Sequence, residues 1–193
     1  PSDGAPQWAA VARSRAFEHG TGFPAPLWRL TPTSVRNLSS HGDDFLFFKI
    51  PLQGSYSVEG DVTEFNWQDS HLMVAGTWIA PIHGHRVYGI GNVRGEQARI
   101  AISPPLSNLS RPAPIHYRTA VNATQATTYF NGRQIHTQPL NSVQDPWIAI
   151  RSSYRHDGGA DDLRISGTST VPDTISLSES PKLLGWYEYY RRP

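Results

Sequence analysis

Short apolar or alternating segments recur along the chain, and Pro, Gly or Asn residues bound each of them. Residues 45–50 (FLFFKI) form a continuous apolar run, as in a strand covered on both faces. Residues 55–65 (SYSVEGDVTEF) alternate, with Tyr56, Val58 and Val62 on one face, as in a half-buried antiparallel strand. About ten such segments follow one another without the spacing of βαβ units, which constrains the chain to an antiparallel sandwich or jelly roll.

The other segments are assigned by the same patterns. Strands are expected at residues 71–80, 85–93, 97–102, 115–121, 126–130, 133–137, 147–153 and 161–166. Asn131-Gly132 is the strongest short hairpin signal in the chain. Trp8, Val11 and Ala12 recur at helical spacing and predict a short helix within residues 6–18. We therefore divide the chain into an N-terminal arm (1–36) with this short helix, a β-sandwich domain (37–180) and a C-terminal extension (181–193) that ends in mid-pattern, as in a truncated piece of a larger protein.

Composition excludes several classes of function. With 17 basic and 16 acidic residues and no long basic run, the chain lacks the electrostatic footprint of a nucleic-acid-binding protein. No apolar stretch approaches the ~18 residues that a membrane-spanning helix needs. The absence of Cys excludes disulfides and thiolate metal sites.

Three stretches resemble a known superfamily when taken in order. Residues 44–62 (DFLFFKIPLQGSYSVEGDV), 127–135 (TTYFNGRQI) and 158–177 (GGADDLRISGTSTVPDTISL) resemble a strand pair, a hairpin and the closing strand of concanavalin A-like lectins and glucanases. Together with LLGWYEYY they look most like a domain of unknown function from large planctomycete proteins. The resemblance implies an all-β, concanavalin A-like jelly-roll sandwich of two antiparallel sheets, preceded by a short N-terminal arm. It implies no settled activity.

Candidate ligand-binding residues concentrate in one region of the sequence. Glycan sites combine flat aromatic faces with neighbouring polar groups that pair with hydroxyls. The candidates are Trp67, Trp78, His83, His85, Arg86 and Tyr88. Trp67 stands in a connecting loop, whereas Trp78 lies within an expected strand and has a core position as its alternative. His83 and His85 are also spaced to share a face and bind a metal, but no third ligand is evident.

Two patterns raise catalytic alternatives. Glu59-x-Asp61-x-x-Glu64 matches the carboxylate spacing of retaining glycosidases of this fold, with a solvent-facing strand as the alternative. Gln134-Ile135-His136 matches a catalytic triplet of jelly-roll polysaccharide lyases, but it follows a hairpin turn and the other lyase strands are missing. Glu59, Asp61 and His136 are therefore weak catalytic candidates.

A Gly-rich acidic loop raises calcium as a cofactor. Asp157, Asp161 and Asp162 could supply the oxygen ligands that hard cations prefer. By resemblance, Asp161 and Asp162 fall beside the closing strand, where folds of this class often hold calcium.

The sequence as a whole favours a non-catalytic, carbohydrate-binding module of a larger exported or cell-surface protein. The resemblance places such a protein outside the cell, in the periplasm or on the cell surface. Its partner would be a glycan or another subunit of a surface assembly. A structural subunit that packs on other proteins, and a glycosidase or lyase that cleaves polysaccharide, stay open as alternatives.

Overall fold

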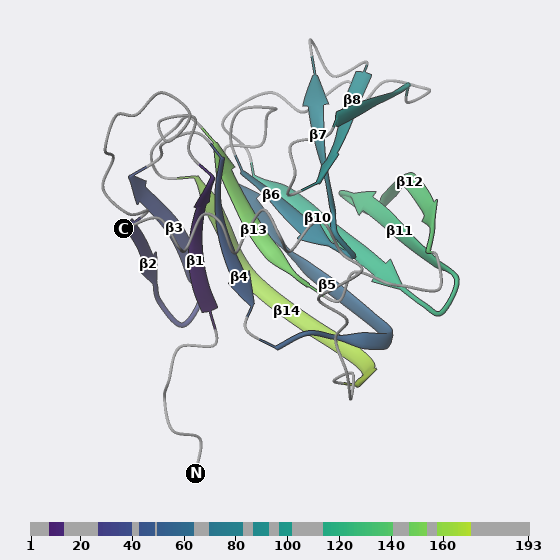
Figure 1. The fold of residues 1–193 in the computed structure, drawn as a ribbon, viewed down its shortest axis with the longest axis horizontal. Helices are drawn as coiled ribbons and strands as arrows, with labels where there is room; N and C mark the ends of the chain where they lie inside the picture. The colour runs from purple at the N-terminus through teal and green to yellow at the C-terminus, as the bar shows by residue number, and fades with distance from the viewer. Residues whose placement is uncertain are drawn as a thin grey trace.

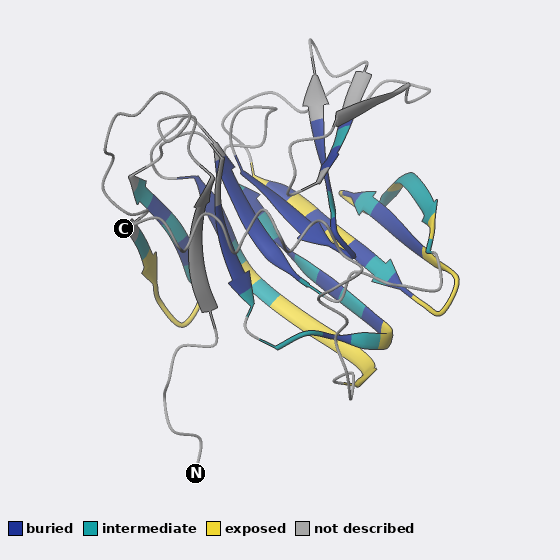
Figure 2. Ribbon diagram, in the orientation of Figure 1, coloured by how far each residue is buried: buried dark blue, intermediate teal, exposed yellow. Residues whose placement is uncertain are grey.

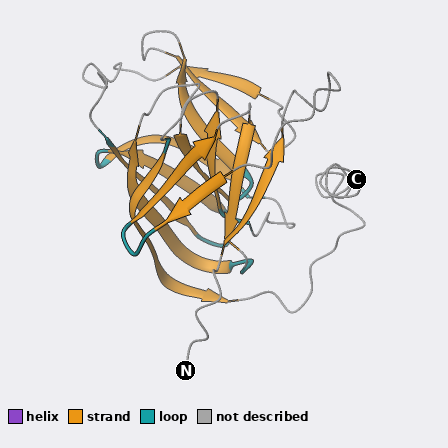
Figure 3. Cartoon of the chain, turned by 90° about the vertical axis from the view of Figure 1, so that its left-hand side faces the viewer, coloured by secondary structure: helices purple, strands orange, loops and turns teal. Residues whose placement is uncertain are grey.

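The computed structural model describes residues 8–13, 27–39, 43–48, 50–63, 70–82, 87–92, 97–101, 114–140, 147–153 and 158–170. Within these ranges every regular element is a β-strand, and the strands form two antiparallel sheets of seven strands each (Figure 1). Figure 3 shows the same arrangement from the side. The all-β sandwich of two antiparallel sheets is thus confirmed.

Each sheet mixes strands from distant parts of the sequence. Sheet A runs in the order β1 (Trp8–Arg13), β4 (Asp43–Phe48), β13 (Ala149–Ser153), β6 (Ser70–Val74), β7 (Thr77–Ile82), β8 (Val87–Asn92) and β9 (Gln97–Ala101). Sheet B runs in the order β12 (Arg133–Pro139), β11 (Gln125–Phe130), β10 (Ile115–Val121), β5 (Gln53–Thr63), β14 (Gly159–Thr170), β3 (Ser34–Ser39) and β2 (Leu27–Leu30).

The main core fills the space between the sheets. Val58 and Val62 of β5 are at most 1% exposed, and they belong to one cluster with Leu72 and Ile150 of sheet A (Figure 2). Tyr117 of β10 also ties the sheets together, because its hydroxyl accepts a hydrogen bond from the Ile79 backbone N–H at 3.3 Å. Burial raises the pKa of the Tyr117 phenol well above its ordinary value, so the group stays neutral and able to make this bond.

Sheet A is buried on its outer face as well. A second cluster lies there, formed by Phe45, Phe47, Met73, Trp78, Ala80 and Ala149, each at most 7% exposed. Arg151 is 2% exposed and lies 4.1 Å from the centre of the Trp78 ring, and its guanidinium is 2.9 Å from His71 Nδ1. Burial on both faces explains why the sequence around β4 is a continuous apolar run.

The structure corrects the expectations for the N-terminal region. Residues 8–13 form strand β1, so the helix predicted within residues 6–18 is wrong over these positions. All six residues of β1 pair with β4, and this pairing outweighs the helix propensity of an Ala-rich segment. The boundary drawn between residues 36 and 37 falls inside β3, which with β2 forms one side of sheet B.

Two tight turns define hairpins. Asn131-Gly132 joins β11 to β12 with φ of 49° and 78°, which confirms the predicted turn. Residues 71–80 form a hairpin rather than the single strand expected, because Ala75-Gly76 turns the chain between β6 and β7 with φ of 50° and 77°.

Candidate functional site

Sheet B carries polar side chains across its outer face. In β5, Tyr56, Val58 and Val62 are buried, while Ser57, Glu59, Asp61 and Thr63 are partly exposed. In β10, Ile115, Tyr117 and Val121 are buried, whereas His116 and Arg118 are exposed. Because side chains alternate along a strand, the partly exposed set shares one side of the sheet.

The register places these side chains in a row that crosses five strands. Glu59 of β5 is paired with Arg164 of β14 on one side and with Arg118 of β10 on the other. Arg118 is paired with Tyr129 of β11, and Tyr129 with Gln134 of β12. We call this row and its neighbours the outer polar face: Arg36, Glu59, Asp61, His116, Arg118, Tyr129, Gln134, Asp161 and Arg164.

His116 bridges the two carboxylates of β5. Its Nδ1 lies 2.8 Å from Asp61 Oδ1, and its Nε2 lies 3.9 Å from Glu59 Oε2. The three side chains remain 48% (His116), 43% (Asp61) and 31% (Glu59) exposed. Both ring nitrogens therefore face acceptors, which orients the imidazole on an accessible surface.

Arg118 presents a guanidinium beside an aromatic ring. Its Nε donates to Ser57 Oγ at 3.2 Å, and its Cζ lies 5.1 Å from the centre of the Tyr129 ring. A guanidinium carries five N–H donors in a planar fork. Held at Nε and against the ring, this exposed fork is oriented to donate to an acceptor on the outer face.

An ion pair forms the margin of the outer polar face towards β3. Arg36 Nη2 lies 2.7 Å from Asp161 Oδ1 and donates to Asp161 Oδ2 at 2.8 Å. Asp161 stands opposite Asp61 in the β5–β14 register, so the Arg36 charge offsets a close approach of two carboxylates.

The calcium site at the acidic loop stays a prediction. Asp161 forms an ion pair with Arg36. Asp162 is exposed, and its backbone N–H donates a hydrogen bond to the Thr33 carbonyl oxygen at 2.8 Å. Asp157 lies outside the described residues. Within the described part of the chain, no group of three or more acidic or His side chains is arranged to hold a metal ion.

The spacing of Glu59 and Asp61 along β5 does not by itself establish the active-site geometry of a glycosidase. Glu59 and Asp61 share a face as the sequence predicted, but both are partly exposed and both approach His116. A carboxyl group that acts as a general acid often owes its raised pKa to apolar surroundings, whereas Glu59 and Asp61 are 31% and 43% exposed, and their catalytic role stays a prediction. Glu64 lies outside the described residues.

The Gln134 and His136 side chains are separated by a β-bulge. Tyr129 pairs with Gln134, but the adjacent Thr128 pairs with His136, so one extra residue is inserted into β12. Tyr129 and Thr128 point to opposite faces of β11, and so do their partners in β12. Gln134 therefore faces outward with Tyr129, whereas His136 is half-buried on the inner side, and the two cannot act on one substrate group.

The stability of this domain should depend on pH through His136. Burial lowers the pKa of its imidazole below the ordinary 6.5, because desolvation disfavours the charged form. In the unfolded chain the imidazole binds a proton at higher pH than in the folded domain. The free energy of unfolding should therefore fall as pH drops from about 6.5 towards the lower pKa of the folded state.

The measurement is urea unfolding of the wild type and His136→Gln between about pH 7.5 and 5. The difference between the two stability curves should narrow in the acid range, because only the wild type takes up this proton on unfolding. A constant difference across the range would show that His136 titrates alike in both states.

Of the candidate ligand residues of the 67–88 region, the structure describes the side chain of Trp78 alone. Trp78 is 2% exposed and stacks on His71 with ring centroids 5.3 Å apart, so it belongs to the core and offers no face to a ligand. Trp67, His83, His85 and Arg86 lie outside the described residues. Tyr88 is part of β8, but its side chain is not described. Their ligand roles stay predictions.

Sequence reasoning missed five members of the outer polar face. These are Arg36, His116, Arg118, Tyr129 and Arg164. His116 and Arg118 lie within the predicted strand 115–121, but their closeness to Glu59 and Asp61 depends on the pairing of β5 with β10.

Comparison with known proteins places the fold among lectin-like jelly rolls. A carbohydrate-binding module, CBM66 from Bacillus subtilis, is similar with a TM-score of 0.51 and 16% identity over 83% of this chain and 96% of its own. A protein of unknown function with a galectin-like fold, also from Bacillus subtilis, has a TM-score of 0.51 and 8% identity over 82% and 88%. The exoplasmic/lumenal domain of VIP36 in its Ca²⁺/mannose-bound form has 0.50 and 8% over 92% and 89%.

Comparison at the level of sequence matches only part of the chain. The family described as a protein of unknown function (DUF1581) matches residues 118–193. No curated protein matches the chain. The planctomycete origin implied by the resemblance stays a prediction. In the described part of the chain, no helix has the length and apolar character that crossing a membrane requires.

Proposed function

We propose that this domain is a non-catalytic, carbohydrate-binding module of a larger exported or cell-surface protein, and that it binds glycan on the outer polar face. The observation that carries the proposal is the row Arg164–Glu59–Arg118–Tyr129–Gln134, which places donor and acceptor side chains next to one another across five neighbouring strands. Strands in a sheet lie about 4.8 Å apart, so successive groups in the row are spaced to meet successive hydroxyls of an oligosaccharide.

The chemistry of the row suits a hydroxyl-rich ligand. Each sugar hydroxyl can donate and accept, and its binding requires partners of both kinds to replace water. Glu59 and Asp61 accept, Arg118 donates, and the Tyr129 ring adds a flat apolar surface. The likeness in fold to a carbohydrate-binding module and to a mannose-bound lumenal domain supports the same function.

A glycan-array screen of the isolated domain tests the proposal. The wild type should bind a subset of glycans, and Arg118→Ala should weaken that binding about tenfold or more, since a hydrogen bond from a charged donor is lost. Arg29→Ala is the matched control, because Arg29 is exposed on β2 at the far side of sheet B. The screen is run with and without calcium to test the candidate metal site.

A Trp67→Ala variant separates the two candidate locations for the glycan. Binding lost in Trp67→Ala but kept in Arg118→Ala would move the site to the 67–88 region and away from the outer polar face. No saturable binding across the array would overturn the carbohydrate-binding function itself.

A further inference from the structure

Among the described strands, none pairs with one edge of β14 over its second half. β3 pairs with β14 only from Gly159 to Asp161, whereas β5 pairs with it as far as Thr170. Asp162, with φ of 49°, donates its N–H to Thr33 O and marks the end of the β3 pairing. From Leu163 to Thr170 no described strand lies on the second side, and residues 164–170 are all exposed (yellow in Figure 2).

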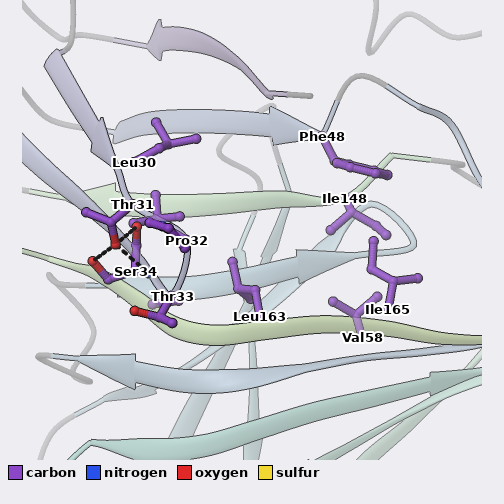
Figure 4. Close-up of a pocket in the computed structure, with 12 residues that line it drawn as sticks. Leu30, Thr31, Pro32, Thr33, Ser34, Phe48, Val58, Ile148, Leu163 and Ile165 are labelled. Carbon is purple, nitrogen blue, oxygen red and sulfur yellow. Dashed lines mark hydrogen bonds between the residues drawn. The ribbon is translucent and has the colours of Figure 1, made fainter. Parts of the chain in front are cut away.

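A pocket opens beside this edge. Its volume is about 340 Å³, and it lies between the sheets where the β2–β3 turn meets β14. Figure 4 shows Leu163 and Ile165 of β14 near Val58 and Ile148, with the turn residues Thr31 to Ser34 at the other end. The turn hydroxyls are engaged locally, since Thr31 Oγ1 and Ser34 Oγ lie 2.9 Å apart. Most of the remaining lining is apolar.

Two exposed hydrophobic residues single out this pocket. Among the described residues, the large hydrophobic side chains that remain exposed are Leu30 at 40% and Ile165 at 38%, and both line it. An unpaired strand edge also carries backbone N–H and C=O groups that need partners or water. Backbone groups without a described strand partner and exposed apolar side chains thus lie at the same edge of β14.

We propose that an extended peptide segment of a partner protein docks here by strand addition, pairing with Leu163–Thr170 and placing a branched aliphatic side chain in the pocket. In sheet B, β3 lies beside Gly159–Asp161 of β14, and such a segment would lie on the same side of β14 further along the strand. Main-chain hydrogen bonds supply the affinity, and the pocket supplies selectivity for the aliphatic residue. Arg164 is exposed at the start of this edge and favours an acidic residue in the segment.

The shape of the edge favours a peptide over other occupants. The β2–β3 hairpin extends sheet B sideways at one end of the free edge, so the edge forms a notch rather than a straight border. A slender segment fits this notch, whereas the flat edge of a second folded copy would meet the hairpin. An alkyl ligand would fill the pocket but leave the backbone groups of β14 unmet. Apart from Arg164, which belongs to both, the residues of this edge and pocket are not members of the outer polar face, so this inference does not rest on the glycan proposal.

The test uses synthetic peptides about eight residues long, which match the free edge at ~3.3 Å per residue. They alternate Thr with one central Ile and carry a terminal Glu. Two further peptides have alternate amides N-methylated, one on each edge of the strand. Binding is followed by NMR of the domain amides at 163–170 and by titration calorimetry.

Strand addition predicts that the two N-methylated peptides differ in binding. Methylation of one edge should abolish binding and methylation of the other should leave it, since only one edge of the peptide faces β14. Replacing the peptide Ile with Ala, or Ile165 with Lys in the domain, should weaken binding about tenfold. Gln125→Lys, an exposed change at the other side of sheet B, should not. If Ile165→Lys does not fold, the methylated peptides on the wild type still decide the question.

Three outcomes would overturn the proposal. One is the absence of binding by every unmethylated peptide. Another is equal binding of both methylated peptides. The last is binding of decanol, used as an alkyl probe, at the same pocket without any peptide binding, which would assign a small apolar ligand instead.

Discussion

Gly159→Ala should destabilise this domain more than Gly91→Ala or Gly132→Ala does. A Cβ at Gly159 would lie 1.8 Å from the Val35 carbonyl oxygen and 3.1 Å from Arg36 Cα. These are backbone atoms of β3, so contact can be relieved only by separating β14 from β3. We expect a loss of about 3 kcal/mol or more in the free energy of unfolding, at the upper end of overpacking effects, measured by urea denaturation followed by circular dichroism.

Gly132→Ala is the matched control for this prediction. No atom lies within 4 Å of a Cβ at Gly132, so its cost comes from its φ of +78° alone. That cost should be about 1–2 kcal/mol. Equal destabilisation by the two substitutions would contradict the close approach of β14 to β3, and with it the position of Asp161 beside Arg36.

The two sheets differ in what their outer faces offer to a ligand. On sheet A, Arg151 and His71 are at most 2% exposed and lie among Trp78 and Phe side chains. On sheet B, the charged groups remain partly open to water, although His116 and Asp61 form one pair and Arg36 and Asp161 another. A polar ligand can therefore reach charged donors and acceptors on sheet B without displacing a core.

The strand pattern was predictable because it depends on local periodicity. The segment 115–121 was predicted with its observed bounds, since its alternation coincides with burial of every second residue. The turn at Ala75-Gly76 was not, because Ala rarely adopts a positive φ and the flanking residues are all strand formers. Strand β1 was also missed, because its partner β4 follows about thirty residues later and pairing over that separation leaves no local signal.

The candidate site was predictable only in fragments. Glu59, Asp61 and Asp161 were singled out for their spacing and charge, yet their neighbours His116, Arg118 and Arg36 depend on strand pairing across long sequence separations. Gln134 and His136 stand two residues apart, so uninterrupted alternation would place them on one face of β12. The bulge opposite Thr128 and Tyr129 breaks that alternation, and no residue in RQIHT marks it.

Gly91→Ala is the second substitution expected to have a large effect. Gly91 of β8 pairs directly with Trp78 of β7, and a Cβ there would lie 2.0 Å from Trp78 Cζ2. The indole cannot retreat easily, because it is buried against His71 and under the Arg151 guanidinium. We expect a loss of about 2–3 kcal/mol in stability, together with a changed near-ultraviolet circular dichroism signal from the displaced ring.

A smaller ring at position 78 should relieve that clash. Trp78→Phe alone leaves a cavity and is destabilising, but combined with Gly91→Ala it makes room for the new methyl group. The double variant should therefore be more stable than the sum of the single effects implies, by about 1–2 kcal/mol. Additive effects would mean that the two residues are not in contact. Because both lie in sheet A, glycan binding by the folded fraction should be unchanged, which separates the buried aromatic cluster from the outer polar face of sheet B.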